Sequence, residues 1–332
     1  MRGRQGIPQL CKLPTTRTLK QELMKTNFLR TLSLGALLAS TALAFVSGGG
    51  GGGGGTPVNV CAYNVFALGN LTASYSDIQG AAAAGGNASF TGYSVGQNLP
   101  SNPAAYSVVA GGTVSFTNGQ VDNGSVVANG NVTLQSVSVL HGNVISGGTI
   151  SLTNGQINGS QLPYQLNPVP INFSGAGIYL RGAANFYAAI PANGTVTNNY
   201  GGLVLQGSSS TLNVFAVPAS VLSSVWGVQI IVPAGSTVLV NVSGTSATVP
   251  NVGYNYSGTD ATHVLYNYYQ ATTLTIAQGQ GTILAPLAAA TFPWGVVNGT
   301  IVVNSFTGNG QANIAGFVGV LPGLPTSGPL CH

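Results

Sequence analysis

Charged side chains are scarce in this sequence. The chain has 332 residues but only eight Lys and Arg and four Asp and Glu, and seven of the eight basic residues lie in the first thirty positions. Beyond residue 45 the formal charges are those of Arg181, Asp77, Asp122 and Asp260. Nucleic-acid binding needs several Lys or Arg to displace phosphate counterions, and attraction to anionic membranes needs a basic cluster. The body of the chain has neither, which excludes both classes of partner.

Long apolar runs are missing as well. Beyond the N-terminal region no run reaches the roughly 18 residues that a spanning helix requires, so we expect no membrane insertion of the mature chain. Disorder is disfavoured because hydrophobic residues make up 44% of the chain and the net charge is low. Gly, Ser, Thr and Asn interrupt short Val, Ile and Leu runs throughout. This pattern is typical of an all-β protein with many turns.

The N-terminal region has the order of a secretory signal peptide. A basic segment at Met24–Arg30 precedes the apolar stretch 32–43, and Ala42-Leu43-Ala44 is a small-residue cleavage motif. We therefore predict cleavage near Ala44 and a secreted or cell-surface protein.

The same reasoning divides the chain into segments. Residues 1–23 are interpreted as upstream sequence translated in error, and 24–44 as the signal peptide. Residues 45–61 form a glycine-rich tether, because a glycine run behaves as flexible coil. The main domain is expected over 62–318, followed by a C-terminal tail over 319–332.

Internal repeats predict the fold. Residues 107–160 divide into three units of 18 residues in which apolar positions coincide and alternate with Thr, Ser and Asn. The period returns in 281–298 and 299–316, and a spacing of about 17 residues relates 64–70 to 82–87. The aligned apolar positions are Val108, Val126 and Val144; Val114, Val132 and Ile150; Phe116, Leu134 and Leu152; and Val121, Val139 and Ile157. A short fixed period with strand alternation and glycine corners indicates a parallel β-solenoid, whose coils stack at about 4.8 Å.

One segment departs from the β pattern. From Phe173 to Ile190 the larger residues recur at steps of three and four, which predicts one apolar face of an α-helix. Ser174 is the expected N-cap, and Pro191 ends the segment. We expect this helix, at about 173–190, to pack alongside the solenoid, and short strands to resume over 195–280.

Four stretches carry a family resemblance: NVFALGNLTASYSDIQGAAAAGGNASFTGYSVG at 64–96, LNVFAVPASVLSS at 212–224, VPAGSTVLVNVSGTS at 232–246 and HVLYNYYQATTLTIAQGQGTILAP at 263–286. In this order they resemble the bacterial choice-of-anchor A domain, and the resemblance covers about 62–318. It implies an extracellular adhesin-type module whose ligand could be a collagen-like protein. The sequence departs from the family pattern near its C-terminal anchor, since Leu324–Gly328 matches a sortase signal imperfectly.

Catalytic and metal-binding chemistry finds little support. Glycoside hydrolysis uses two carboxylates, whereas Asp77, Asp122 and Asp260 are far apart in sequence and fit turn or capping positions. His263 follows Asp260 at turn spacing, which predicts a local hydrogen bond. We therefore expect no enzyme activity and no cofactor.

The histidines point the same way. His141, His263 and His332 are scattered, which is unlike a zinc site. Solenoid calcium sites need periodic Asp, and the three 18-residue units contain only Asp122. We therefore expect no metal.

Two cysteines remain after removal of the leader with Cys11. Cys61 and Cys331 bracket the predicted domain, and an exported chain meets an oxidising environment. The sequence leaves two alternatives: a disulfide that ties the two ends of the domain, or two free thiols.

These observations favour adhesion, through a neutral Thr/Asn/Ser-rich solenoid surface, to an extracellular protein or glycan. Two alternatives stay open. Regular Thr and Asn ladders could bind ice or another crystal surface, and the chain could be a structural component of a coat or biofilm matrix. The ligand's identity and the oligomeric state do not follow from the sequence.

Overall fold

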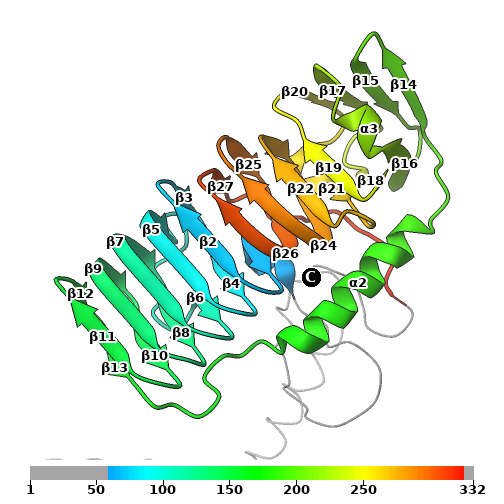
Figure 1. Cartoon of the computed structure of the whole chain (residues 1–332). Coiled ribbons are helices and arrows are strands. Elements are labelled where there is room, and N and C mark those ends of the chain that lie inside the picture. The colour runs from blue at the N-terminus through cyan, green and yellow to red at the C-terminus, as the bar shows by residue number, and fades with distance from the viewer. Residues whose placement is uncertain (1–58, 325–332) are drawn as a thin grey trace, which may run out of the picture. The chain divides into compact units, whose positions relative to one another are not determined.

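The computed structural model describes residues 59–324, so the predicted signal peptide, most of the predicted tether, Cys11 and Cys331 lie outside the described residues. Among the described residues, twenty-three strands join into one sheet, in which neighbouring strands are parallel. Paired strands lie in neighbouring coils, which confirms the predicted parallel β-solenoid (Figure 1).

The pairings form three ladders, which we call faces A, B and C. Face A contains β1 (Val65–Ala67), β4 (Ala82–Ala84), β6 (Tyr106–Ala110), β8 (Ser125–Ala128), β10 (Val144–Ser146), β13 (Gln161–Leu162), β16 (Leu212–Pro218), β18 (Thr237–Ser243), β21 (Val264–Asn267) and the first parts of β24 (Thr282–Phe292) and β26 (Ile301–Gly308).

Face B contains β2 (Leu71–Ser74), the first parts of β5 (Ala88–Val95), β7 (Val114–Asn123) and β9 (Val132–His141), then β11 (Ile150–Thr153), β19 (Ser246–Val249), β22 (Thr273–Ile276) and the last parts of β24 and β26. Face C contains β3 (Asp77–Ile78), the last parts of β5, β7 and β9, then β12 (Gln156–Ile157), β23 (Gly279–Gln280), β25 (Val296–Asn298) and β27 (Gln311–Asn313).

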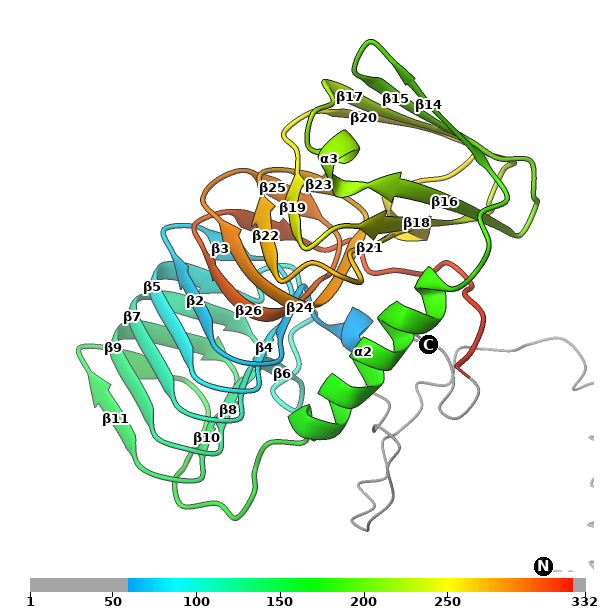
Figure 2. The ribbon, with the colours of Figure 1, turned by 45° about the vertical axis from the view of Figure 1, so that its right-hand side comes forward.

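A separate four-stranded sheet lies beyond β18 and β19. It contains β14 (Thr195–Asn199), β15 (Gly202–Gln206), β17 (Gly227–Ile231) and β20 (Gly253–Ser257), and only the β14–β15 pair is antiparallel. The short helix α3 (Ala219–Leu222) lies beside it (Figure 2). Two 3-10 turns, η1 (Val60–Ala62) and η2 (Ala261–His263), complete the described elements.

The order of coils in space differs from their order in the chain. The chain begins in the middle of the solenoid at β1, builds coils up to β13, and returns along α2 (Phe173–Ala188) before building the other half from β16 to β27. The first and last coils then meet, because β1 pairs with both β4 and β26. In Figure 1 the blue strands accordingly lie beside the orange and red ones.

The predicted ladders have the predicted register. Val114, Val132 and Ile150 are paired in succession, as are Phe116, Leu134 and Leu152. Their side chains point inward, and the Phe90 and Phe116 rings pack against each other at a tilt of 33°, with centroids 4.9 Å apart. These residues form one continuous core inside the coils.

The corner between faces B and C uses left-handed backbone. Tyr75, Asn118, Ser136 and Asn154 have positive φ, and Gly92 occupies the same corner at φ 59°. This conformation turns the chain within one residue, which Gly and Asn tolerate better than most residues. The corners therefore stay short and the faces stay aligned.

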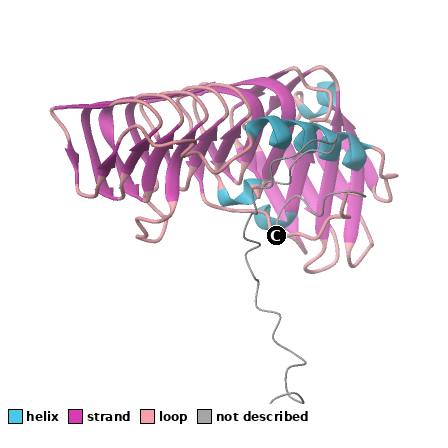
Figure 3. Cartoon of the chain, turned by 90° about the horizontal axis from the view of Figure 1, so that it is seen from below, coloured by secondary structure: helices cyan, strands magenta, loops and turns pink. Residues whose placement is uncertain are grey.

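The predicted helix is present at Phe173–Ala188, and its N-cap differs from the prediction. Asn172 caps it by accepting a hydrogen bond at 3.0 Å from the backbone N–H of Gly175, so the expectation of Ser174 is wrong by two residues. Asn competes well for this position because its short side chain reaches the free N–H groups of the first turn. α2 lies alongside the strands in Figure 3.

The folded body extends a few residues beyond both predicted boundaries. Val60, which the sequence places in the tether, is fully buried in η1, and Leu321, beyond residue 318, is also buried. Cys61 is disulfide-bonded. The other two cysteines of the chain lie outside the described residues, so the pairing of Cys61 with Cys331 stays a prediction.

Candidate functional site

A continuous column of hydroxyl side chains follows the outside of face B. Each of nine coils contributes one Thr or Ser, and neighbours in the column are directly paired residues. The members, in spatial order, are Thr248, Thr275, Thr291, Thr307, Thr72, Ser89, Ser115, Thr133 and Ser151. Eight steps of about 4.8 Å give the column a length of roughly 38 Å.

Strand alternation aims these hydroxyls at solvent. In β9, Val132 and Leu134 are fully buried whereas Thr133 between them is exposed. Seven members of the column are exposed and two, Thr248 and Ser89, are half-buried. One face of the strand packs in the core and the other faces water, as expected for a half-buried strand.

A second polar column borders the first at the corner between faces A and B. Asn70, Asn87 and Asn131 each accept a backbone N–H from the next coil through Oδ1, all at 2.9 Å, from Asn87, Thr113 and Thr149 respectively. These bonds hold the asparagines in fixed orientations and link successive coils. The edge of face B is therefore rigid as well as polar.

Face B carries no formal charge in any of its strands between β19 and β11. Binding to it cannot depend on ion pairs, so it must depend on hydrogen bonding and shape. In the half of the solenoid formed by β2, β5, β7, β9 and β11, these strands lie side by side and are not covered by α2 (Figure 2).

Face A cannot serve the same purpose because α2 covers it. The outward residues of face A, among them Phe66, Val109 and Leu284, form a second buried cluster with Leu180 and Tyr187 of the helix. Two buried amides add polar ties: Asn267 donates to the backbone oxygen of Ala184 at 2.8 Å and Asn241 to that of Tyr187 at 2.8 Å.

Two of the three carboxylates lie on face C. Asp77 begins β3, and desolvation by burial raises its pKa. Asp122 lies in β7 and accepts a 2.6 Å hydrogen bond from Gln120; desolvation still raises its pKa overall. The coil of β5 separates the two residues. Neither occupies a turn, so that part of the sequence interpretation is wrong.

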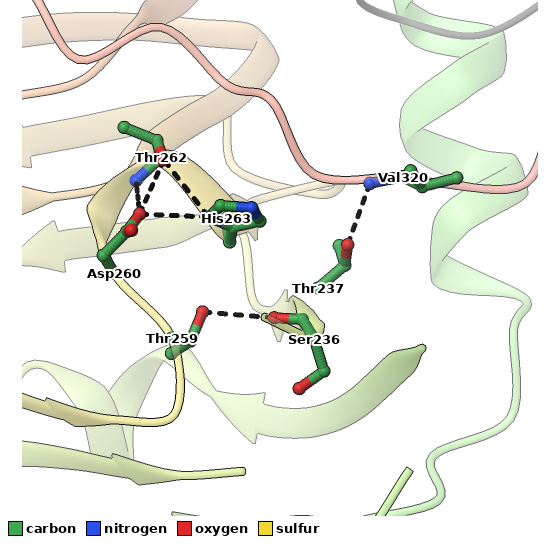
Figure 4. A network of polar contacts seen from close by, with 7 residues as sticks. All are labelled: Ser236, Thr237, Thr259, Asp260, Thr262, His263 and Val320. Atoms are coloured by element: carbon green, nitrogen blue, oxygen red, sulfur yellow. Dashed lines mark hydrogen bonds and ion pairs between the residues drawn. The ribbon is translucent and has the colours of Figure 1, made fainter. Parts of the chain in front are cut away.

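The third carboxylate caps a turn (Figure 4). Asp260 Oδ1 accepts the backbone N–H of Thr262 at 2.8 Å and its hydroxyl at 2.6 Å, and His263 Nδ1 lies 3.1 Å away. These hydrogen bonds, above all that of the Thr262 side chain, lower the pKa of Asp260. The predicted local contact between Asp260 and His263 is confirmed.

The surroundings of this turn are structural. Thr259 Oγ1 donates to the backbone oxygen of Ser236 at 3.2 Å, and the backbone N–H of Val320 donates to Thr237 Oγ1 at 2.8 Å. The network fastens η2 and the C-terminal segment to the solenoid. His141 is exposed and its Nδ1 lies 2.9 Å from the backbone oxygen of Asp122.

The described residues were searched for metal-binding groups and for membrane-spanning helices. Among residues 59–324 no group of three or more His, Cys, Asp or Glu is placed to hold a metal ion. Within the same residues no helix is long and apolar enough to cross a membrane.

Four of the nine members of the hydroxyl column could not be aligned from the sequence. The steps from Thr248 to Thr275, Thr291 and Thr307 are 27, 16 and 16 residues, so the 18-residue period does not align these four residues. The sequence did contain a local pattern for these residues, because Thr273 and Thr275 alternate with the apolar residues Leu274 and Ile276, which are buried. That alternation predicts which side chains of a strand face solvent, but it does not predict which strands pair with each other.

The chain is similar to a family of adhesive domains and to one solved ice-binding protein. A family model described as "Putative Ice-binding-like adhesive domain" matches residues 60–314. The crystal structure of an ice-binding protein from the Antarctic ascomycete Antarctomyces psychrotrophicus aligns over 77% of this chain and 96% of that one, at 12% identity and a TM-score of 0.29. So low a TM-score carries no weight for the fold, which rests on the strand pairings. A search of curated proteins finds no match.

Proposed function

We propose that this chain, which belongs to the family of ice-binding-like adhesive domains, binds an extended uncharged surface outside the cell through face B. The observation that supports this most directly is the nine-member hydroxyl column. A long column of equivalent groups suits a target that repeats, such as a polymer or a solid.

Binding to a surface depends on the number of contacts and on the entropy lost when they form. A single hydroxyl contributes a net hydrogen bond of only about 0.5–1.5 kcal/mol, so one contact cannot hold a surface. Nine such contacts together can hold a surface, provided that the protein loses little conformational entropy on binding. The strand pairings supply that rigidity, because every column member except Thr248 and Ser151 at the two ends is paired on both sides.

We further propose that the ligand belongs to the extracellular matrix and that the chain is secreted. The resemblance to the choice-of-anchor A domain suggests an extracellular matrix target, either a collagen-like protein or a glycan. The signal-peptide pattern supports secretion with cleavage near Ala44. The chain would act by binding, without catalysis, since the coil of β5 separates Asp77 from Asp122 on face C and no other carboxylate lies in the strands of that face.

A matched pair of substitutions in one strand tests the use of face B. Thr133→Tyr places a bulky ring in the middle of the column, whereas Ser138→Tyr places the same ring on face C of the same β9 strand. Retention of purified protein on collagen-coated and polysaccharide-coated beads is the readout. We expect Thr133→Tyr to reduce retention at least about tenfold and Ser138→Tyr to leave it unchanged. Equal retention of Thr133→Tyr and the original chain would show that face B is not the binding face.

A second candidate target is ice, and one observation favours it specifically. The column repeats a hydroxyl at each coil step of about 4.8 Å, and Thr291 Oγ1 lies 3.5 Å from Thr275 Oγ1 in the next coil. Hydroxyls at a regular spacing on an uncharged plane can hold an ordered layer of water. Thermal hysteresis that Thr133→Tyr abolishes and Ser138→Tyr preserves would select this candidate. No hysteresis, with retention on a matrix, would select adhesion.

A further inference from the structure

An exposed aromatic pair lies on the four-stranded sheet, away from face B. Trp226 precedes β17, and Tyr200 lies in the tight turn between β14 and β15. Trp226 is 70% exposed and Tyr200 is fully exposed. Isolated exposed aromatic residues are common on proteins, so the question is whether these are held in a defined position.

The indole of Trp226 is fixed by the turn beneath it. Its Nε1–H donates to the backbone oxygen of Tyr200 at 2.9 Å, and its backbone N–H donates to Gly201 at 2.9 Å. A Cβ atom on Gly201 or Gly202 would lie 2.8 Å from the indole ring, so the ring rests directly on these two glycines. Any side chain there would push the ring away.

The turn between β14 and β15 has a backbone conformation that leaves room for the indole ring. Gly201 has φ +92° and Tyr200 φ 50°, both in the left-handed region. Asn198 Oδ1 accepts the N–H of Gly201 at 2.7 Å and so closes the turn. One ring face is thus occupied by backbone while the side chain as a whole remains mostly in solvent.

The surroundings are polar and neutral. Gly202 pairs with Gly227, and the next row of the same sheet surface contains Thr197, Gln229 and Asn255 in paired positions around Val204. Buried partners such as Leu203 and Val228 alternate with this row and point to the core. The four strands and the turn contain no charged residue.

We propose that Trp226 is the platform of a second binding site, which takes a neutral sugar ring of a glycan chain. The flat C–H face of a pyranose would stack on the indole, and its hydroxyls would bond to nearby amide and hydroxyl groups. A rigid aromatic ring loses little entropy on binding. A charged ligand finds no counter-charge in the four strands or the turn.

This site is independent of the proposed use of face B. Trp226 lies on a sheet that is separate from the solenoid sheet. The two sites would let one molecule engage a surface and a glycan at once.

The chain offers a direct spectroscopic test because it has two tryptophans, Trp226 and Trp294. In a Trp294→Phe variant, intrinsic fluorescence reports on Trp226 alone. The probes are neutral hexasaccharides built from glucose, mannose, galactose and N-acetylglucosamine. We expect a saturable blue shift or quenching with at least one of them.

Matched variants make the outcome decisive. Trp226→Ala should weaken calorimetric binding of that hexasaccharide at least about tenfold, whereas Trp294→Ala and Ser138→Tyr should leave it unchanged. Circular dichroism verifies folding, and Trp226→Phe, which keeps a ring, should retain part of the affinity if Trp226→Ala fails to fold. The proposal is overturned if no hexasaccharide changes the fluorescence, if Trp226→Ala binds like the original chain, or if a collagen peptide alone produces the change.

Discussion

Val65 pairs with Ile301 in parallel register, although the two residues lie near opposite ends of the folded segment. On its other side Val65 pairs with Ala82. The first coil is therefore inserted between the last coil and the second one. Each half of the solenoid depends on this junction to cover an exposed strand edge, so the two halves should unfold together.

The register of the core is open to a charge-insertion test. Val132 lies in the inward ladder between Val114 and Ile150 and is fully buried. Val132→Asp should destabilise the fold by on the order of 4 kcal/mol or more, because the carboxylate is buried without a partner. Urea denaturation measures the loss. Thr133→Asp, one residue away and exposed, is the control and should change stability little; equal effects would contradict the register.

The attachment of α2 depends on buried amides. Asn267 donates to the backbone oxygen of Ala184 and to Asn241 Oδ1 at 2.9 Å. Asn267→Ala leaves these acceptors without their donor, which should cost about 1–3 kcal/mol. Chemical denaturation should show this loss. Asn255→Ala on the exposed sheet surface should not, and a silent Asn267→Ala would mean that the hydrogen bonds of Asn267 do not stabilise the attachment of the helix.

Two aspartates should give opposite pH dependence. Burial raises the pKa of Asp77 in the folded state, so its contribution to stability is present at low pH and is lost as pH rises through the raised pKa. Asp77→Asn should therefore melt above the original chain at pH 7 and level with it at pH 3.

Asp260 provides the counterpart. Hydrogen bonds lower its pKa, so its contribution is present above the ordinary carboxyl range and is lost as pH falls through the lowered value. Asp260→Asn should melt below the original chain at pH 7, and the difference should shrink in acid. Calorimetric melting at several pH values checks both variants, and shifts of the same sign would contradict the assignment.

Surface binding through face B should be insensitive to salt. Because the strands of face B carry no charge, screening has nothing to weaken. Retention on the matrix that binds best should change less than about twofold between 0.05 and 0.5 M NaCl. A steep decline would place charged residues outside face B in the contact.

The disulfide of Cys61 should stabilise the fold substantially. If Cys331 is the partner, the closed loop spans nearly the whole domain, and the chain-entropy estimate is on the order of 5 kcal/mol. Peptide mapping under non-reducing conditions identifies the partner. Cys61→Ser should then lower the melting temperature as much as reduction does, and a peptide that links Cys61 to any residue other than Cys331 would refute the predicted pairing.

The sequence alone determined the coil and its register. Val114, Val132 and Ile150 could be aligned because their coils have equal length, and strand alternation then assigned the inner and outer faces. The same periodicity reasoning located α2 within two residues of its end. It missed Asn172 as the cap, because Asn172 and Ser174 are both good capping residues and only the backbone decides between them.

Tertiary structure decided the order of the coils in space, and hence which side chains become neighbours on the surface. No local pattern states that β26 lies against β1 and β2, since that contact joins residues far apart in the chain. Yet this junction makes Thr307 a neighbour of Thr72 and turns two shorter rows of hydroxyls into one column. The turn that holds Trp226 over Gly201 and Gly202 is likewise a product of folding. Side-chain chemistry and period are written in short stretches of sequence, whereas a binding surface depends on which stretches become adjacent.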